Sequence, residues 1–426
     1  MSIARCRPPS APRWMPGRRS AARRRRCTSS RTSASSGSPC TSRSKAETPV
    51  ARYRVYLSDV SYFSGKLEGA LRAKRIAYER VRITPDILLR EVLPNTGWMK
   101  VPAVRREDGL WLCDSTPLLR WLDAEHPQRA LIPADPYRAF LSALIEDYCD
   151  EWQWRPAMFW RWAWPDNARY LGARLGAELS AGTPHPAWAM GLYFRKRQQR
   201  IYLRGDGVRA HNFDAIAELY PQALAWLEAL LEKRRYLLGD RPSLVDIAWF
   251  GPMFRHYAQD PRPAALMAAT APRVWAWVTR LWNCAAEDWT ETALDDFSDP
   301  AWAPIFTDLG GAYLPYLKDN ATALATGARH FDGRYGGIDY PRLPAIRYRA
   351  RCLATLRHDY AALTAETRAR VDARLAGTGI VEVLRLPVPE GDVRPISSAL
   401  AGPPRQIGFA QRLRFYFSGT PWDAPP

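Results

Sequence analysis

The sequence of 426 residues predicts an α/β domain, then an all-helical domain, then a mostly helical extension. Strand and helix patterns alternate over about residues 52–126, whereas apolar residues recur at helical spacing over 135–290. Residues 291–426 contain one further helical stripe before proline and glycine accumulate. Apolar side chains make up 47% of the chain, which is enough for a sizeable core.

The first predicted domain, residues 51–127, contains a strand, a helix, a second strand, a short irregular segment, a hairpin and a closing helix. We place the regular elements at 54–57, 64–74, 78–83, 101–113 and 117–125. Asp108-Gly109 lies between two apolar runs and predicts the hairpin turn. Ser115 and Thr116 precede Pro117 and are expected to cap the closing helix. This order of elements is that of a thioredoxin-like domain.

A proline-rich segment at 126–136 is expected to link this domain to an all-helical domain at 135–290. Ser243 and Asp246 are spaced as the N-cap and N3 residues of a capping box, which predicts a helix start there. Another helix shows the full spacing of one buried face, at Val274, Trp277, Val278 and Leu281. No clear strand pattern interrupts these stripes, so the second domain is predicted to be all-α.

The extension, residues 291–426, is predicted to be partly helical and then irregular. One apolar stripe follows a helix at Leu353, Leu356, Tyr360 and Leu363. Four arginines lie largely off this stripe and are expected to face solvent, at Arg347, Arg349, Arg351 and Arg357. Beyond residue 386 the accumulation of proline and glycine makes regular structure doubtful.

Residues 1–50 form a basic tail that we expect to be disordered. The tail contains eleven arginines and one lysine against one glutamate, so it supplies +11 of the formal charge of +18. It has almost no apolar periodicity and cannot bury enough surface to fold. A transit peptide and a start codon assigned too far upstream would both give this composition. Because most of the positive charge lies here, we do not expect the folded body to bind nucleic acid.

Cysteine and histidine positions predict neither a disulfide framework nor a metal site. Three of the seven cysteines lie in the tail, and no C-x-x-C pair occurs among the others, Cys113, Cys149, Cys284 and Cys352. The histidines also lack metal-ligand spacing. No apolar run approaches the roughly 18 residues of a membrane span. We therefore expect a soluble cytoplasmic protein.

The turn between the first strand and the first helix contains Ser61 and Ser64. Redox proteins of the thioredoxin-like class place two cysteines at this spacing, so the two serines exclude dithiol–disulfide chemistry at this turn. A hydroxyl at a helix N-terminus can donate to an anion, and the helix dipole adds about 0.3–1 kcal/mol. Both effects would lower the pKa of a bound thiol. Plain capping of the helix by either serine is the alternative.

Three separated segments resemble the cytosolic glutathione S-transferase family over about residues 52–290. Residues 61–68, SYFSGKLE, are similar to its serine-type active-site turn and first helix. Val101-Pro102 together with Asp114-Ser115 resembles its cis-proline step and acid–serine pair. Residues 239–247, GDRPSLVDI, resemble the capped helix of its helical domain. Their common order and spacing make the resemblance stronger than any single motif.

The resemblance implies a glutathione-binding site formed by Lys100, Val101, Pro102, Asp114 and Ser115. Val101 would pair its backbone with the cysteinyl part of glutathione, beside an expected cis bond to Pro102. Asp114 and Ser115 would hold the γ-glutamyl end, with help from the helix N-terminus. Lys100 would pair with the glycyl carboxylate. Asp114 stands where the family more often has Glu or Gln, which shortens the reach by one methylene.

Three hydroxyls are candidates for the catalytic group. Ser61 aligns with the serine that donates to the glutathione thiolate in the family. Tyr56 lies close to the position of the catalytic tyrosine in the tyrosine-type classes. Tyr62 follows Ser61 where many members have a small residue or proline. All three remain candidates from the sequence.

The implied activity is that of a glutathione transferase, with glutathione as co-substrate and a small hydrophobic electrophile as its target in detoxification. An aromatic electrophile site between the domains could draw on Trp152, Trp154, Trp160, Trp162 and Trp164. A homodimer is an assembly that the resemblance allows. Because fold alone does not decide function, a non-catalytic binding or scaffold protein of the same fold is the alternative.

Overall fold

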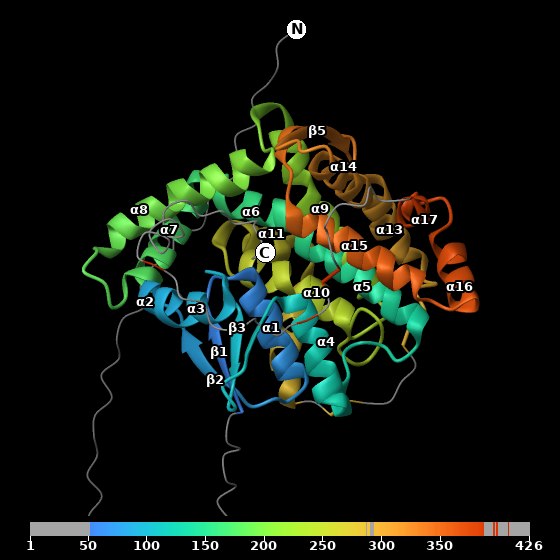
Figure 1. Cartoon of the computed structure of the whole chain (residues 1–426), viewed down its shortest axis with the longest axis horizontal. Coiled ribbons are helices and arrows are strands. Elements are labelled where there is room, and N and C mark those ends of the chain that lie inside the picture. The colour runs from blue at the N-terminus through green and yellow to red at the C-terminus, as the bar shows by residue number, and fades with distance from the viewer. Residues whose placement is uncertain are drawn as a thin grey trace, which may run out of the picture. The chain divides into compact units, whose positions relative to one another are not determined.

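The computed structural model describes residues 52–286, 288–289 and 294–386, together with residues 395, 396, 398 and 408. The predicted tail, residues 1–50, and most of the chain beyond residue 386 lie outside the described residues. The predicted succession of an α/β domain, an all-helical domain and a mostly helical extension is confirmed (Figure 1). None of the described helices is both long enough and apolar enough to cross a lipid bilayer.

The first domain is built on a four-stranded sheet with the order β2-β1-β3-β4. Its main elements are β1 (Tyr53–Leu57), α1 (Tyr62–Ala73), β2 (Glu79–Arg82), β3 (Ala103–Arg106), β4 (Trp111–Cys113) and α4 (Ser115–Glu125). Strand β1 is parallel to β2 and antiparallel to β3, with Val55 opposite Val104 and Val104 opposite Leu112. These three residues share a buried cluster with Leu67, Leu71, Leu118 and Leu122. Helices α1 and α4 therefore cover one face of the sheet.

The segment between β2 and β3 is helical, and the prediction of an irregular segment is wrong. It forms α2 (Pro85–Ile87), the π-helical turn η1 (Leu88–Val92) and α3 (Leu93–Thr96). Thr84 caps the first turn by accepting the N–H of Ile87 at 3.2 Å, and Pro85 occupies the first helical position. Gly97 ends the segment with a φ of 77°. The Thr84-Pro85 pair is a helix-start signal that the sequence analysis overlooked.

Helix α4 begins at Ser115, so its cap position is Asp114, one residue before the predicted cap at Ser115. Asp114 has a φ of 70° and makes no side-chain capping bond to the helix. Ser115 and Thr116 are the first two residues of the helix itself. The Thr116 hydroxyl instead donates to Glu146 at 3.0 Å and lies 3.3 Å from Asp150. The predicted capping role fails because this hydroxyl satisfies buried carboxylates of another helix.

The second domain is helical throughout its described part. Its α-helices are α5 (Pro136–Glu151), α6 (Trp154–Trp162), α7 (Pro165–Ser180), α8 (Ala187–Gln198), α9 (Phe213–Leu230), α10 (Leu244–Pro252), α11 (Pro261–Thr270) and α12 (Pro272–Asn283). Short 3-10 and π turns accompany them at η2 (Pro127–Arg129), η3 (Gln199–Leu203), η4 (Arg204–Asp206), η5 (Ala210–Asn212), η6 (Met253–Tyr257) and η7 (Cys284–Ala286). The predicted capping box at the start of α10 is confirmed, with the Ser243 N–H donating to Asp246 at 2.9 Å.

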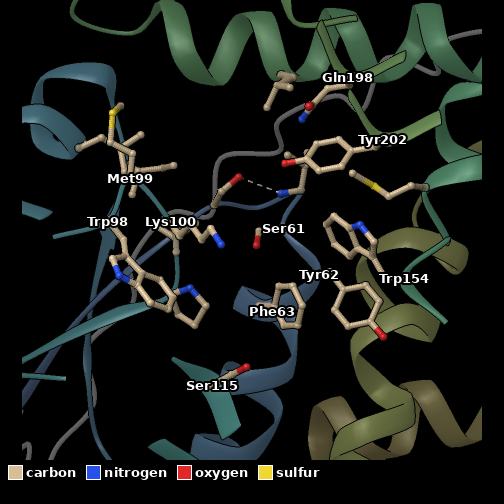
Figure 2. Close-up of a pocket in the computed structure, with 18 of the residues that line it drawn as sticks. Ser61, Tyr62, Phe63, Trp98, Met99, Lys100, Ser115, Trp154, Gln198 and Tyr202 are labelled. Atoms are coloured by element: carbon tan, nitrogen blue, oxygen red, sulfur yellow. Dashed lines mark hydrogen bonds between the residues drawn. The ribbon is translucent and has the colours of Figure 1, made fainter. Parts of the chain in front are cut away.

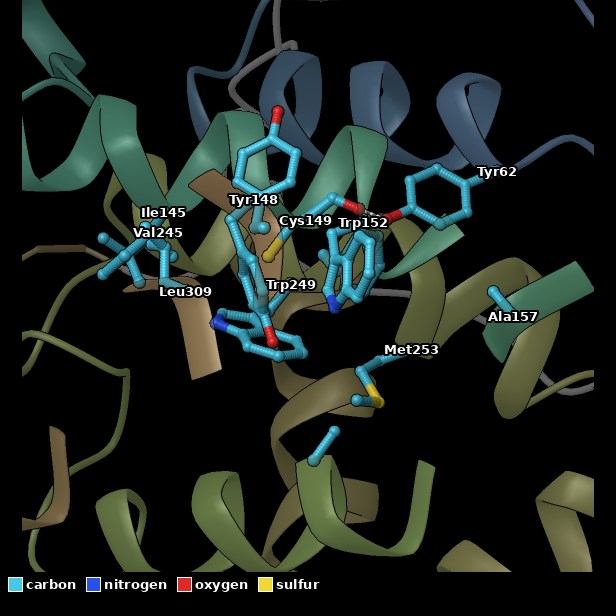
Figure 3. Close-up of a cluster of buried hydrophobic side chains, with 14 of the residues drawn as sticks. Tyr62, Ile145, Tyr148, Cys149, Trp152, Ala157, Val245, Trp249, Met253 and Leu309 are labelled. Carbon is cyan, nitrogen blue, oxygen red and sulfur yellow. Dashed lines mark hydrogen bonds between the residues drawn. The ribbon is translucent and has the colours of Figure 1, made fainter. Parts of the chain in front are cut away.

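The core of this domain lies between α5 and α10 (Figure 3). Figure 3 shows Tyr148 and Trp152 from the end of α5 gathered with Trp249 and Met253 from the α10 region. Tyr148 and Trp249 are fully buried and pack edge to face, with 6.1 Å between their ring centroids. The last turn of α5 is therefore enclosed on this side by aromatic side chains.

The extension consists of helices and one hairpin. Its elements are η8 (Pro300–Trp302), α13 (Ala303–Asp308), η9 (Leu309–Tyr313), α14 (Leu314–Ala325), β5 (His330–Tyr335), β6 (Ile338–Pro344), α15 (Arg347–Ala361), α16 (Ala365–Leu375) and α17 (Ile380–Arg385). The β5–β6 hairpin was not predicted, although Gly336 and Gly337, with φ of 55° and 79°, form a two-glycine turn signal between its strands.

The extension is attached to α5 by a buried arginine. Arg349 is fully buried, and its Nε donates to Glu151 at 2.9 Å. Its Nη1 lies 3.4 Å from Asp206 and also donates to the Tyr316 hydroxyl. Arg347, in contrast, is exposed. The prediction that the arginines of this helix face solvent is therefore wrong for Arg349, because the second domain supplies buried carboxylates that pair with it.

Arg349→Met is expected to lower the free energy of unfolding by about 3–5 kcal/mol, because Glu151 would stay buried without its cationic partner. Urea titration of the full chain measures this loss. Arg347→Met is the matched control at an exposed position of the same helix, and should change stability by about 0.5 kcal/mol or less. Equal losses for the two variants would contradict the structural role assigned to Arg349.

Candidate active site

A cavity of about 400 Å³ separates the first domain from α6, α7 and α8. On the side of the first domain, the polar groups of Ser61, Lys100, Asp114 and Ser115 lie among apolar side chains such as Phe63, Leu88 and Met99, and we refer to these four polar residues as the polar wall. The opposite wall is mostly apolar and includes Met158, Trp162, Leu171, Leu175 and Phe194. Figure 2 shows Ser61 between the two walls, with Trp98 and Lys100 on one side and Trp154 and Tyr202 on the other. A bipartite cavity of this size suits a ligand with one polar and one apolar part.

The cavity brings together seven of the eight residues that the sequence analysis proposed for the site: Ser61, Tyr62, Lys100, Val101, Pro102, Asp114 and Ser115. Tyr56 is not among the lining residues. The expected cis peptide bond between Val101 and Pro102 is present. The roles of these residues toward a ligand remain predictions.

Ser61 is the N-cap residue of α1. Its Oγ accepts the backbone N–H of Ser64 at 3.3 Å, so its own hydrogen is still available for donation. Ser64 is fully buried, and its Oγ accepts the N–H of Ser58 at 3.2 Å. The sequence left open which serine caps the helix and which could face a ligand, and the structure distinguishes the two. Both support the turn, but Ser61 is the one that reaches the cavity.

The two candidate tyrosines direct their hydroxyls into the protein. The ring of Tyr62 touches the cavity, but its hydroxyl donates to the Cys149 carbonyl at 2.7 Å within the core (Figure 3). The Tyr56 hydroxyl donates to Glu91 at 2.7 Å. Burial and this bond to Glu91 raise the pKa of Tyr56 to about 12. Neither hydroxyl is positioned to donate to a ligand in the cavity.

Asp114 and Ser115 lie where the hairpin meets α4. Ser115 is the first residue of α4, so its backbone N–H is one of those that a helix leaves without an intrahelical partner. Burial raises the pKa of the Asp114 carboxyl, and this effect is opposed by a hydrogen bond from Tyr348 and by the charge of Lys100. The Tyr348 hydroxyl lies 2.9 and 3.0 Å from the two Asp114 oxygens. Tyr348 was not predicted as a site residue, because no local sequence signal marks a residue of the extension as part of the cavity.

The tryptophans of residues 152–164 have separate roles. Trp154 and Trp162 line the cavity. Trp152 is buried in the core, and the Trp160 indole donates to the Ala217 carbonyl at 3.0 Å. Trp164 packs edge to face against Phe213, with 5.2 Å between ring centroids. Two of the five thus belong to the cavity wall.

Below the cavity, α5 presents four buried carboxylates: Glu146, Asp147, Asp150 and Glu151. Lys66 of α1 donates to Glu146 at 2.6 Å and to Asp150 at 2.5 Å. Burial by itself disfavours the charged ammonium, but the two carboxylates outweigh it and raise the pKa of Lys66. Asp150 and Glu151 also line the cavity, so this cluster forms its acidic floor.

Asp147 differs from its neighbours because its partner is neutral: it accepts the Tyr313 hydroxyl at 2.6 Å. Burial raises the pKa of Asp147 to about 7, against the lowering effect of the Tyr313 bond. A raised carboxyl pKa makes the folded state bind the proton more tightly than the unfolded chain. The stability that this proton contributes is therefore complete below about pH 4 and is lost as the pH rises through 7.

Asp147→Asn removes this titration, so the variant does not lose the stability that the parent loses as the pH rises. The free energy of unfolding of the variant minus that of the parent is therefore expected to increase by about 2 kcal/mol from pH 5 to pH 8. Urea unfolding across this range measures the difference. Asp319→Asn is the control, because Asp319 also accepts a tyrosine hydroxyl, that of Tyr335 at 2.9 Å, but is half-exposed. A difference between Asp147→Asn and the parent that stays constant with pH would contradict the assignment.

Two family models match parts of the chain. Residues 55–130 match the family model of the glutathione S-transferase N-terminal domain, and residues 210–280 match that of the C-terminal domain. Neither match extends beyond residue 280. No curated protein matches the chain.

The solved structures that the chain resembles are distant in sequence. A glutathione S-transferase from Rhodospirillum rubrum F11 is 19% identical with a TM-score of 0.37, and the match covers 57% of this chain and 95% of that one. One from Methylobacterium radiotolerans, solved with glutathione sulfonate, is 22% identical with a TM-score of 0.35, and covers 57% and 98%. A β-etherase from Sphingobium sp. strain SYK-6 is 19% identical with a TM-score of 0.39, and covers 60% and 98%. By these two models, the chain contains an N-terminal domain of the glutathione S-transferase family at residues 55–130 and a C-terminal domain of that family at residues 210–280.

Proposed function

We propose that the chain binds glutathione in this cavity and activates its thiol for attack on a small apolar electrophile. The observation that supports this most is the position of Ser61, a helix N-cap hydroxyl between the polar and apolar walls of one cavity. A tripeptide on the polar wall would place its central thiol near Ser61. An electrophile on the apolar wall would then face the sulfur.

The polar wall supplies groups suited to each end of glutathione. The N-terminus of α4, which begins at Ser115, would hold the γ-glutamyl carboxylate, since unpaired backbone N–H groups bind anions. Asp114 would accept hydrogen bonds from the γ-glutamyl ammonium. Lys100, whose Nζ lies 5.0 Å from the Trp98 ring centroid, would pair with the glycyl carboxylate. The backbone of Val101 would align the cysteinyl residue between these ends.

The N-terminus of α1 supplies two groups that would activate the thiol, the Ser61 hydroxyl and the positive end of the helix dipole. The thiol releases its proton to solvent, and the thiolate accepts a hydrogen bond from the Ser61 hydroxyl. The positive end of the α1 dipole adds about 0.3–1 kcal/mol of stabilisation. Both effects favour the thiolate and so lower the pKa of the bound thiol. The sulfur then forms a bond to the electrophilic carbon, and the leaving group departs with the electron pair of the broken bond.

Ser61→Ala is expected to raise the pKa of bound glutathione and to lower kcat about ten- to a hundredfold, because a hydrogen bond to a charged group is lost. The ultraviolet absorbance of the thiolate, followed against pH in the complex, measures the pKa directly. Tyr56→Phe and Tyr62→Phe are the controls and should leave the thiol pKa unchanged, because both hydroxyls donate inside the protein.

Two outcomes would contradict this proposal. If Tyr56→Phe alone raises the thiol pKa, the activating hydroxyl is misassigned. If glutathione binds to the parent without any lowering of its thiol pKa, the chain is a non-catalytic member of the fold.

The apolar wall is tested by Phe194→Ala, which should raise KM for a chlorodinitrobenzene electrophile about tenfold, because a phenyl contact is lost. The Kd for glutathione should not change. Leu192→Ala on the same helix is the control, since Leu192 is 38% exposed and is not among the lining residues. If both variants change KM equally, Phe194 does not form the electrophile site.

A further inference from the structure

The first turn of α15 places a side chain of the extension in the cavity. Tyr348 lines the cavity, and its hydroxyl donates to the Asp114 carboxylate at 2.9 Å from one oxygen and 3.0 Å from the other. Asp114 is the residue proposed to receive the γ-glutamyl ammonium. A residue 234 positions further along the chain therefore reaches the same end of the site.

Tyr348 is fixed on both sides by buried contacts. Just before it, Ile346 exchanges two hydrogen bonds with the Asn320 side chain, at 2.7 and 2.9 Å. Just after it, Arg349 is paired with Glu151 at 2.9 Å. The Tyr348 ring also packs edge to face on Trp98, with 6.4 Å between centroids. Its hydroxyl therefore occupies a defined position and does not depend on a mobile surface side chain.

Several hydrogen-bond acceptors lie at this end of the cavity, together with the ammonium of Lys100, whose charge acts on both Asp114 and Glu151. A tyrosine hydroxyl that donates its single hydrogen to Asp114 keeps its oxygen lone pairs as acceptors. The Asp114 carboxylate retains further lone pairs, and the Glu151 carboxylate lines the same cavity. A primary ammonium, with three N–H donors, matches several convergent acceptors better than any other group of glutathione. The nearby N-terminus of α4 serves the carboxylate that belongs to the same α-amino acid group.

We propose that Tyr348 is an additional ligand-binding residue, whose hydroxyl oxygen accepts a hydrogen bond from the γ-glutamyl ammonium while its hydrogen orients the Asp114 carboxylate. This inference rests on the proposed function and extends it, because the binding site then includes a segment beyond both matched family domains. The amine end of glutathione is held jointly by the first domain and the extension.

Isothermal titration with two ligands tests the role of the hydroxyl. The ligands are glutathione and N-glutaryl-cysteinylglycine, which is the same tripeptide without its amino group. Tyr348→Phe should raise the Kd for glutathione about tenfold, since it removes a hydrogen bond to a charged group. The Kd for the deaminated ligand should stay within about twofold of the parent value, because that ligand never makes the bond.

Tyr335→Phe is the matched control. Tyr335 belongs to the same extension, and its hydroxyl also donates to a carboxylate, that of Asp319 at 2.9 Å, but it does not line the cavity. This variant should leave both Kd values unchanged. Thermal unfolding of each variant shows separately whether the fold is retained.

Three results would overturn the inference while leaving the proposed function intact. An unchanged Kd for glutathione would show that the Tyr348 hydroxyl makes no contact with the ligand. An equal loss for both ligands would show a purely structural role. Tighter binding of glutathione to Tyr348→Phe would show that the hydroxyl occupies the place of the amine. If the parent binds neither ligand, the proposed function itself fails.

Discussion

The buried carboxylates of α5 are the constraint on which the arrangement of the other elements depends: Glu146, Asp147, Asp150 and Glu151. An unpaired buried carboxylate costs several kcal/mol, so neighbouring elements must supply a partner for each one. The partners come from α1, from the start of α4 and from the extension: Lys66, Thr116, Tyr313 and Arg349. The positions of these three regions against α5 are therefore linked by electrostatics as well as by apolar packing.

This constraint also shapes the cavity. Asp150 and Glu151 line it, and Glu151 is paired with the arginine that follows Tyr348. The contact that attaches the extension to α5 is thus adjacent in sequence to the contact that brings Tyr348 to Asp114. The same turn of α15 therefore attaches the extension to α5 and supplies the hydroxyl that contacts Asp114. The first and second domains alone would leave the Asp114 carboxylate without its hydroxyl partner.

Local sequence signals predicted most of the first two domains and the polar wall of the cavity. Some features depend only on residues close to one another in the sequence and can therefore be recognised there. Examples are the Val101-Pro102 step, Ser61 at a helix start and the Ser243–Asp246 capping box. Arg349 and Tyr348 could not be recognised in this way, because their partners lie 198 and 234 positions away. An arginine off an apolar stripe is typical of a solvated face until the opposing carboxylate is known. The choice of Ser61 over the tyrosines likewise required the hydroxyl contacts of the folded chain.

The most direct test of the account is a crystal structure of the full chain with glutathione bound. The account predicts the cysteinyl sulfur within hydrogen-bonding distance of Ser61 Oγ, and the γ-glutamyl ammonium in contact with both Asp114 and the Tyr348 hydroxyl. A sulfur that lies closer to the hydroxyl of Tyr56 or Tyr62 would contradict the proposed chemistry. A complex in which Tyr348 has moved away from Asp114 to admit the amine would contradict the role assigned to the extension.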